Sequence, residues 1–133
     1  MWFLGFLPVT YIPPYNKLPS EAVDIISKYF RIISGTSGML KEGNIAEIGF
    51  TTETYNYNKN ENVPIETIIS DCKKSIEKTN LCVVVIHPQE YKDESNKKEI
   101  SPEKFRQFKE MLDKLQQLNA TFSTFKDTVY CEE

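Results

Sequence analysis

The only histidine of the chain is the first residue to consider for chemistry. His87 directly follows the apolar run of residues 81–86, Leu-Cys-Val-Val-Val-Ile, which predicts a buried strand of a parallel sheet. It therefore lies at the strand's carboxyl end, the edge where α/β proteins build their active sites. There an imidazole can act as a general acid or base near neutral pH. The alternative is a histidine hydrogen-bonded at a loop start, with no further role.

Two further segments belong to the same predicted edge. Residues 11–16 read Tyr-Ile-Pro-Pro-Tyr-Asn before a predicted helix, and the paired prolines can hold aromatic and amide groups rigidly at a site rim. An ordinary strand-to-helix turn is the alternative for this segment. The residues after the histidine could orient it or contact a substrate. The candidates for substrate contact are Tyr11, Pro14, Tyr15, Asn16, Gln89, Glu90 and Tyr91.

Other sources of catalytic chemistry are not evident in the sequence. A hydrolytic metal site needs about three ligands from His, Asp, Glu or Cys, and we identify no such set around a single histidine. We find no phosphate-binding loop, nucleophile elbow or dinucleotide fingerprint. Cys72 falls on the apolar face of a predicted helix and Cys82 inside an apolar strand, which predicts two small core residues. With Cys131 the chain has three thiols, which cannot all pair within one chain. The redox state of all three stays open.

Composition excludes some classes of partner. The net charge of −3 with mixed signs gives no basic footprint, so we expect no nucleic-acid partner. No apolar run is long enough to span a bilayer. Residues 1–7 are apolar but lack the positive start and cleavage site of a signal peptide, which predicts a buried strand instead. The sequence leaves the cellular location open.

Hydrophobic periodicity predicts the elements that position these residues. Residues 20–30 carry a helical apolar stripe, residues 31–34 are typical of a short strand, and another strand is expected near residues 45–52. Residues 56–62 are expected to form a polar loop. A second helix begins after Pro64, with its apolar face formed by Ile65, Ile68, Ile69, Cys72 and Ile76.

The C-terminal part is predicted to continue the same alternation. After a charged loop at residues 92–99, Ser101 and Pro102 begin an amphipathic helix, and Asn119 is expected to end it in a left-handed conformation. Residues 120–124 are predicted to form a last strand and residues 125–128 a helical turn. The order predicts one α/β domain over residues 1–133 with parallel strands.

Several of these segments together resemble polysaccharide deacetylase domains of the NodB type. Residues 83–91, Val-Val-Val-Ile-His-Pro-Gln-Glu-Tyr, are similar to the family's last motif, an apolar strand ending in histidine. Residues 120–125, Ala-Thr-Phe-Ser-Thr-Phe, resemble the strand that follows. Residues 11–16, with the helix and Ile32-Ile33-Ser34 after them, resemble the third motif in a branch of the family.

The resemblance implies the C-terminal half of a deformed (β/α) barrel and metal-dependent hydrolysis of acetyl groups on a glycan. A zinc-like metal would polarise the acetyl carbonyl, an aspartate would act as base, and a histidine would protonate the leaving amine. By motif match, His87 is that acid. Tyr15 would line the substrate groove, and the backbone near Pro14 would lie close to the oxyanion.

The chain also departs from the family pattern. The motifs that hold the catalytic aspartate and the metal ligands are missing, Ile12 replaces the usual arginine, and no Asp-Trp pair is found. We therefore expect a partial domain that lacks the metal-site half and is inactive alone. The alternatives are a non-catalytic glycan-binding or protein-interaction domain, an unrelated small α/β domain, and self-association through the exposed barrel edge.

Overall fold

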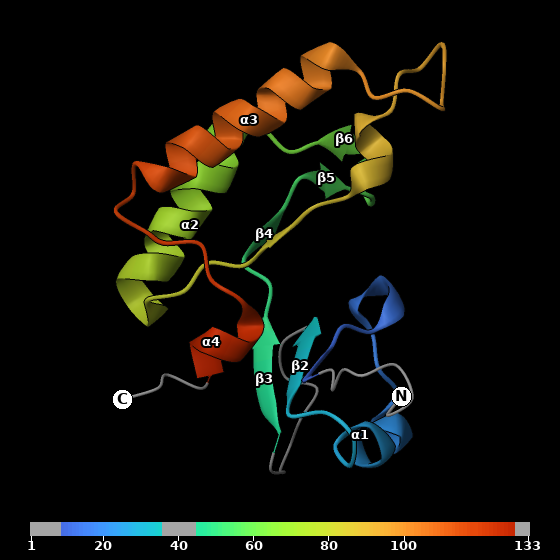
Figure 1. The fold of residues 1–133 in the computed structure, drawn as a ribbon, viewed down its shortest axis with the longest axis vertical. Coiled ribbons are helices and arrows are strands. Elements are labelled where there is room, and N and C mark those ends of the chain that lie inside the picture. Colours follow the sequence, from blue (N-terminus) through green and yellow to red (C-terminus); the bar gives the residue numbers. More distant parts are fainter. Residues whose placement is uncertain (1–8, 36–44, 130–133) are drawn as a thin grey trace. The chain divides into compact units, whose positions relative to one another are not determined.

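The computed structural model describes residues 9–35 and 45–129, and these fall into two compact units. The first unit comprises Met1–Phe50 and Phe122–Glu133, and the second comprises Thr51–Thr121. Figure 1 shows the elements of both. The strand expected at residues 1–7 lies outside the described residues.

The first unit contains a three-stranded parallel sheet in the order β1 (Thr10–Tyr11), β2 (Ile32–Gly35) and β3 (Ala46–Gly49). The crossover from β1 to β2 contains the short 3₁₀ helix η2 (Pro14–Asn16) and helix α1 (Ser20–Ile26). Strand β2 is the central strand of this sheet, and its Ile32 and Ile33 are completely buried. The last helix, α4 (Phe125–Val129), follows at the end of the described chain.

The second unit is a βαβ unit with an added hairpin and a second helix. Strand β4 (Thr52–Glu53) pairs in parallel with β7 (Val84–Val85), and the chain between them forms the antiparallel hairpin β5 (Tyr55–Asn56) and β6 (Glu61–Asn62), then helix α2 (Ile65–Thr79). The 3₁₀ helix η3 (Pro88–Tyr91) and helix α3 (Pro102–Gln116) come after β7. Helices α2 and α3 pack together (Figure 1), and they bury Ile68, Cys72 and Met111.

The coarse fold class is therefore confirmed: the described chain is mixed α/β, and its strand pairs are parallel except in the hairpin. The helices expected after residues 19, 64 and 101 and the final helical turn are all present, although α1 ends at Ile26 and is shorter than predicted. Asn119 has the expected left-handed conformation, with φ of 56°. In the part of the chain that the structure describes, the strands do not close into a barrel.

Two local predictions were wrong. Residues 56–62 form most of a hairpin rather than a loop, and residues 120–124 form no strand. The parallel strand expected at residues 81–86 is present, but β7 covers only Val84–Val85, both half-buried, and Ile86 is 40% exposed. A run of β-branched residues favours extended backbone, but it does not determine how many neighbouring strands cover that backbone.

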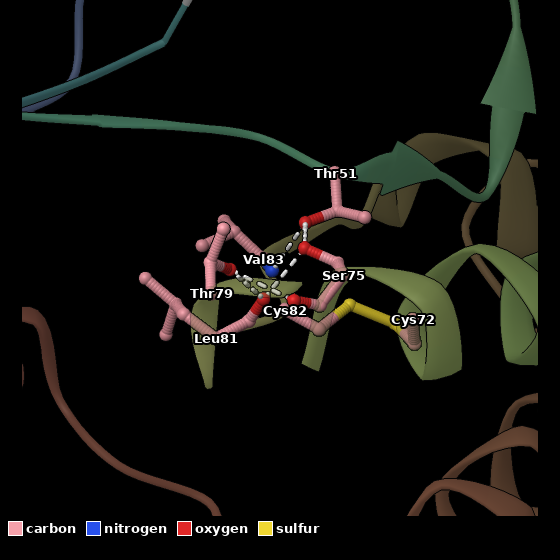
Figure 2. The surroundings of a disulfide bond; sticks show 7 residues. All are labelled: Thr51, Cys72, Ser75, Thr79, Leu81, Cys82 and Val83. Carbon is pink, nitrogen blue, oxygen red and sulfur yellow. Dashed lines mark hydrogen bonds between the residues drawn. A yellow bond between two sulfur atoms is a disulfide. The ribbon is translucent and has the colours of Figure 1, made fainter. Parts of the chain in front are cut away.

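The two cysteines predicted as separate core residues are joined to each other. Cys72 in α2 and Cys82 just before β7 form a disulfide with a Cα–Cα distance of 5.1 Å (Figure 2). The apolar face of α2 covers the segment that leads into β7, which brings the two side chains together although they are ten residues apart. Cys131 lies outside the described residues.

The start of helix α3 gives a direct test of the local structure. The Ser101 side chain accepts a hydrogen bond from the Lys104 backbone N–H at 3.4 Å, and Pro102 occupies the first helical position. Replacing Ser101 by alanine leaves this N–H without its cap, so we expect a loss of about 1 kcal/mol in the free energy of unfolding. Urea denaturation followed by circular dichroism measures it. The control is Ser70→Ala on the exposed face of α2, and equal stability of both variants would contradict the cap.

Candidate proton-transfer site

His87 and Glu53 lie together because β4 and β7 are adjacent parallel strands. Glu53 is paired with Val85, and His87 lies two residues beyond Val85 along the same chain. Since side chains alternate between the faces of a strand, Glu53 and His87 project from the same face at the carboxyl ends of their strands. The Thr54 N–H donates to the Val85 carbonyl at 2.9 Å, and the His87 N–H donates to Thr54 Oγ1 at 3.3 Å. These bonds continue the β4–β7 pairing up to the histidine.

The Glu53–His87 pair is the central feature of the site. Glu53 Oε2 lies 3.4 Å from His87 Nε2, and the two side chains are 29% and 17% exposed, respectively. A carboxylate in this position orients the imidazole by accepting its Nε2–H. The other ring nitrogen, Nδ1, is then the atom that can exchange a proton with a substrate.

Tyr57 closes one side of the imidazole. Its ring meets the His87 ring edge to face, with the centroids 4.9 Å apart and an angle of 83° between the planes. The Tyr57 hydroxyl accepts a hydrogen bond from Gln89 Nε2 at 2.6 Å and donates one to Glu90 Oε1 at 3.1 Å. Desolvation and the adjacent Glu90 carboxylate raise the pKa of Tyr57, although the Gln89 hydrogen bond opposes this. The phenol is thus a neutral donor at physiological pH.

Tyr91 is the last residue of η3, and its ring packs edge to face on Phe108 at 5.4 Å. Burial raises the pKa of Tyr91, and a hydrogen-bonding interaction with the Thr54 side chain opposes the shift. The ring also lines a cavity of the second unit whose apolar side is formed by Ile68, Phe108 and Met111. Tyr91 therefore connects the site to the helical core.

Gln89 and Glu90, two of the predicted contact residues after His87, meet at the Tyr57 hydroxyl. The predicted contact residues within residues 11–16 lie in the first unit. There, Tyr15 is 95% exposed, and Tyr15 and Asn16 both have positive φ, at 56° and 53°. Their turn packs over Gly35, where an added Cβ would lie 3.4 Å from the Asn16 backbone. Tyr11 packs against Phe30 with a ring separation of 5.3 Å. Pro14 begins η2, so the paired prolines lead into this tight turn.

Three residues of the site were missed from the sequence: Glu53, Thr54 and Tyr57. The expected carboxylate signal was a clustered Asp pair at a strand end. The structure instead has one glutamate at the end of a two-residue strand. The available signal was Glu53 directly after Thr51-Thr52, at the end of the strand expected at residues 45–52. Tyr57 carried no such signal, because its position depends on a hairpin that the sequence did not predict.

A catalytic zinc ion needs several His, Cys, Asp or Glu side chains close together. About three protein ligands are usual. Within residues 9–35 and 45–129, no group of three His, Cys, Asp or Glu side chains lies close enough to hold a metal ion. His87 and Glu53 would supply only two. These residues alone do not fit a zinc centre.

Comparison with known proteins adds no family assignment. No protein-family model, curated protein or solved structure matches the chain. Among the described residues, no helix is long and apolar enough to cross a membrane.

Proposed function

We propose that this chain supplies the proton donor and part of the substrate groove of a metal-dependent carbohydrate deacetylase that removes acetyl groups from a glycan. In this proposal its parallel βα units are the C-terminal half of a deformed (β/α) barrel. The observation that carries the proposal is the Glu53–His87 pair, with 3.4 Å between Oε2 and Nε2, at the ends of two parallel strands. The motif resemblance around His87 gives the substrate class.

Hydrolysis of an acetamido group requires a proton for the departing nitrogen. Water adds to the acetyl carbon to form the new C–O bond of acetate, and the bond between that carbon and the nitrogen breaks. The nitrogen leaves as an amine only if it is protonated as it departs. His87 in its imidazolium form donates that proton from Nδ1, while Glu53 holds the Nε2–H and keeps the ring oriented.

The surroundings of His87 also suit a sugar. The Tyr57 ring is 52% exposed, so it offers an apolar surface beside polar groups. Gln89 and Glu90 follow His87 directly and present amide and carboxylate groups next to the Tyr57 hydroxyl. An acetylated glycan that lies against Tyr57 would place polar substituents close to these groups.

A non-catalytic glycan-binding domain is the second candidate. The exposed cluster of Tyr57, Gln89 and Glu90 favours it, since this cluster could hold a sugar without any proton transfer. The two candidates share the binding surface and differ in whether the imidazole reacts. Binding therefore tests the surface, and turnover separates the candidates.

The binding test is an NMR titration of the chain with N-acetylchitotetraose, with cellotetraose as the control ligand. We expect signals of His87, Tyr57 and Gln89 to move with the acetylated sugar and to move less with cellotetraose. Tyr57→Ala should weaken binding about tenfold through loss of the aromatic surface, a change of about 1.4 kcal/mol.

The matched control variant is Phe105→Ala, an equally exposed aromatic on α3, and it should leave the affinity unchanged. If N-acetylchitotetraose moved none of the three signals at millimolar concentration, the glycan proposal would be wrong. Equal loss of affinity in the Tyr57 and Phe105 variants would place the binding surface elsewhere.

A further inference from the structure

The Cys72–Cys82 disulfide lies at the entrance to the strand that leads to His87. Cys72 is fully buried in α2, and Cys82 is two residues before β7 (Figure 2). From Cys82 the chain runs through Val84–Val85 directly to His87. The covalent bond thus fixes α2 to the beginning of the segment whose end carries the proposed acid.

Side-chain hydrogen bonds strengthen the same junction. Ser75 Oγ donates to the Leu81 carbonyl at 2.6 Å and lies 3.3 Å from Thr51 Oγ1, while the Val83 N–H donates to Thr51 Oγ1 at 3.1 Å (Figure 2). Thr51 directly precedes β4, the strand that carries Glu53. We call Cys72, Cys82, Ser75 and Thr51 the disulfide clamp. It joins α2, the start of β7 and the start of β4.

The pairing that the clamp supports is short. Strands β4 and β7 share only two residue pairs, Thr52 with Val84 and Glu53 with Val85. A shift of one residue would turn the side chains of one strand to the other face and separate Glu53 from His87. The position at which β7 begins therefore determines whether the pair forms.

We propose that Cys72, Cys82 and Ser75 are positioning residues for His87, and that the oxidation state of the cysteine pair controls the Glu53–His87 contact. The clamp would then make the site competent in an oxidising compartment and weaken it in a reducing one. The consequence for catalysis rests on the function proposed above. The effect of the disulfide on the position of the His87 ring does not depend on that function.

The difference in exposure between the two cysteine residues predicts the direction of the exchange. Cys82 is partly exposed and Cys72 is not, so an external thiolate such as glutathione attacks Cys82 Sγ. A mixed disulfide forms on Cys82, the original S–S bond breaks, and Cys72 leaves as a thiolate that takes a proton. A second glutathione thiolate attacks the glutathione sulfur of the mixed disulfide and releases Cys82. Two glutathione molecules are thus oxidised to one disulfide, and oxidised glutathione reverses the reaction.

The first test measures this asymmetry in chains in which Cys131 is replaced by serine. Mass spectrometry follows the formation of the glutathione adduct from oxidised glutathione. Cys82 in the Cys72→Ser variant should react faster than Cys72 in the Cys82→Ser variant. Equal rates would contradict the proposed order of attack, and failure of the parent protein to lose two hydrogens under oxidation would overturn the clamp itself.

The second test follows the His87 ring by NMR with the disulfide oxidised and then reduced, and no substrate is needed. We expect loss of the nuclear Overhauser contact between the His87 and Tyr57 rings on reduction, while circular dichroism shows that the helices remain. Ser75→Ala should displace the His87 signals in the oxidised protein, and Cys131→Ser should not. Identical His87 signals in both redox states would overturn the proposal, whether or not the chain binds glycans.

Discussion

Replacing His87 by glutamine is expected to lower the rate of acetyl release from N-acetylchitotetraose by about 10²–10⁴-fold, the usual contribution of a general acid. Glutamine keeps a polar side chain of similar length but cannot donate a proton to the leaving nitrogen. The affinity for the glycan should change little, because Tyr57, Gln89 and Glu90 stay in place. The measurement is acetate release, in the presence of zinc, by the chain complemented with the metal-site half of a NodB-type deacetylase domain, because the chain alone is expected to be inactive.

The control for this experiment is Lys97→Gln, which removes an exposed charge in the loop that follows η3. It should retain the full rate. An unchanged rate in the His87 variant would show that His87 is not the acid. A wild-type chain that binds the glycan but releases no acetate even when complemented with the metal-site half would favour the non-catalytic glycan-binding alternative.

Truncation of Ile68 is expected to have the largest effect on stability. Ile68 is 2% exposed in α2, where this helix packs against α3 and the equally buried Met111. Ile68→Ala leaves a cavity that the surrounding side chains fill only in part, so the free energy of unfolding should fall by about 2–5 kcal/mol. Urea denaturation followed by circular dichroism measures the loss.

The matched control for Ile68 is Ile100→Ala in the same unit. Ile100 is 61% exposed, so its truncation should change the free energy of unfolding by less than about 0.5 kcal/mol. Similar losses in the two variants would contradict the position of the core between α2 and α3. Circular dichroism should be compared with a second probe in the first unit, because the two units can unfold separately.

The helices were predictable from the sequence because their signals are local. Ser101 and Pro102 mark the start of α3, and Ile65, Ile68, Ile69, Cys72 and Ile76 repeat with the helical period in α2. The hairpin β5–β6 was not predicted because its turn depends on specific side-chain bonds. Asn56 Oδ1 accepts from two backbone N–H groups in the turn, and the Tyr55 hydroxyl donates to Asn60 Oδ1 at 2.7 Å.

The strand expected at residues 120–124 does not form, because a local preference for extended backbone is not sufficient. Its threonine and phenylalanine residues favour extended backbone, but a strand needs a partner, and residues 121–124 are exposed. Sequence propensity describes a local preference, whereas pairing depends on distant parts of the chain. The same limit explains why β7 is shorter and less buried than the run of residues 81–86 predicted.

The candidate site was predicted only in part. The position of His87 at a strand end could be inferred from the residues around it, and Gln89 and Glu90 do reach the same network through Tyr57. Glu53 could not be paired with His87 from the sequence, because their contact depends on the parallel register of β4 and β7. The disulfide was missed similarly, since the apolar neighbours of Cys72 and Cys82 were sufficient to explain both as core residues.

The central claim is that Glu53 and His87 act as one proton-transfer unit, and a double-mutant cycle tests it most directly. The rate of acetate release from N-acetylchitotetraose is measured for the wild type, Glu53→Gln, His87→Gln and the double variant, each complemented with the same metal-site half and zinc. If Glu53 acts through His87, the double variant should be no slower than His87→Gln alone. If the two losses multiply, or if Glu53→Gln retains the full rate, the two residues do not act as a unit.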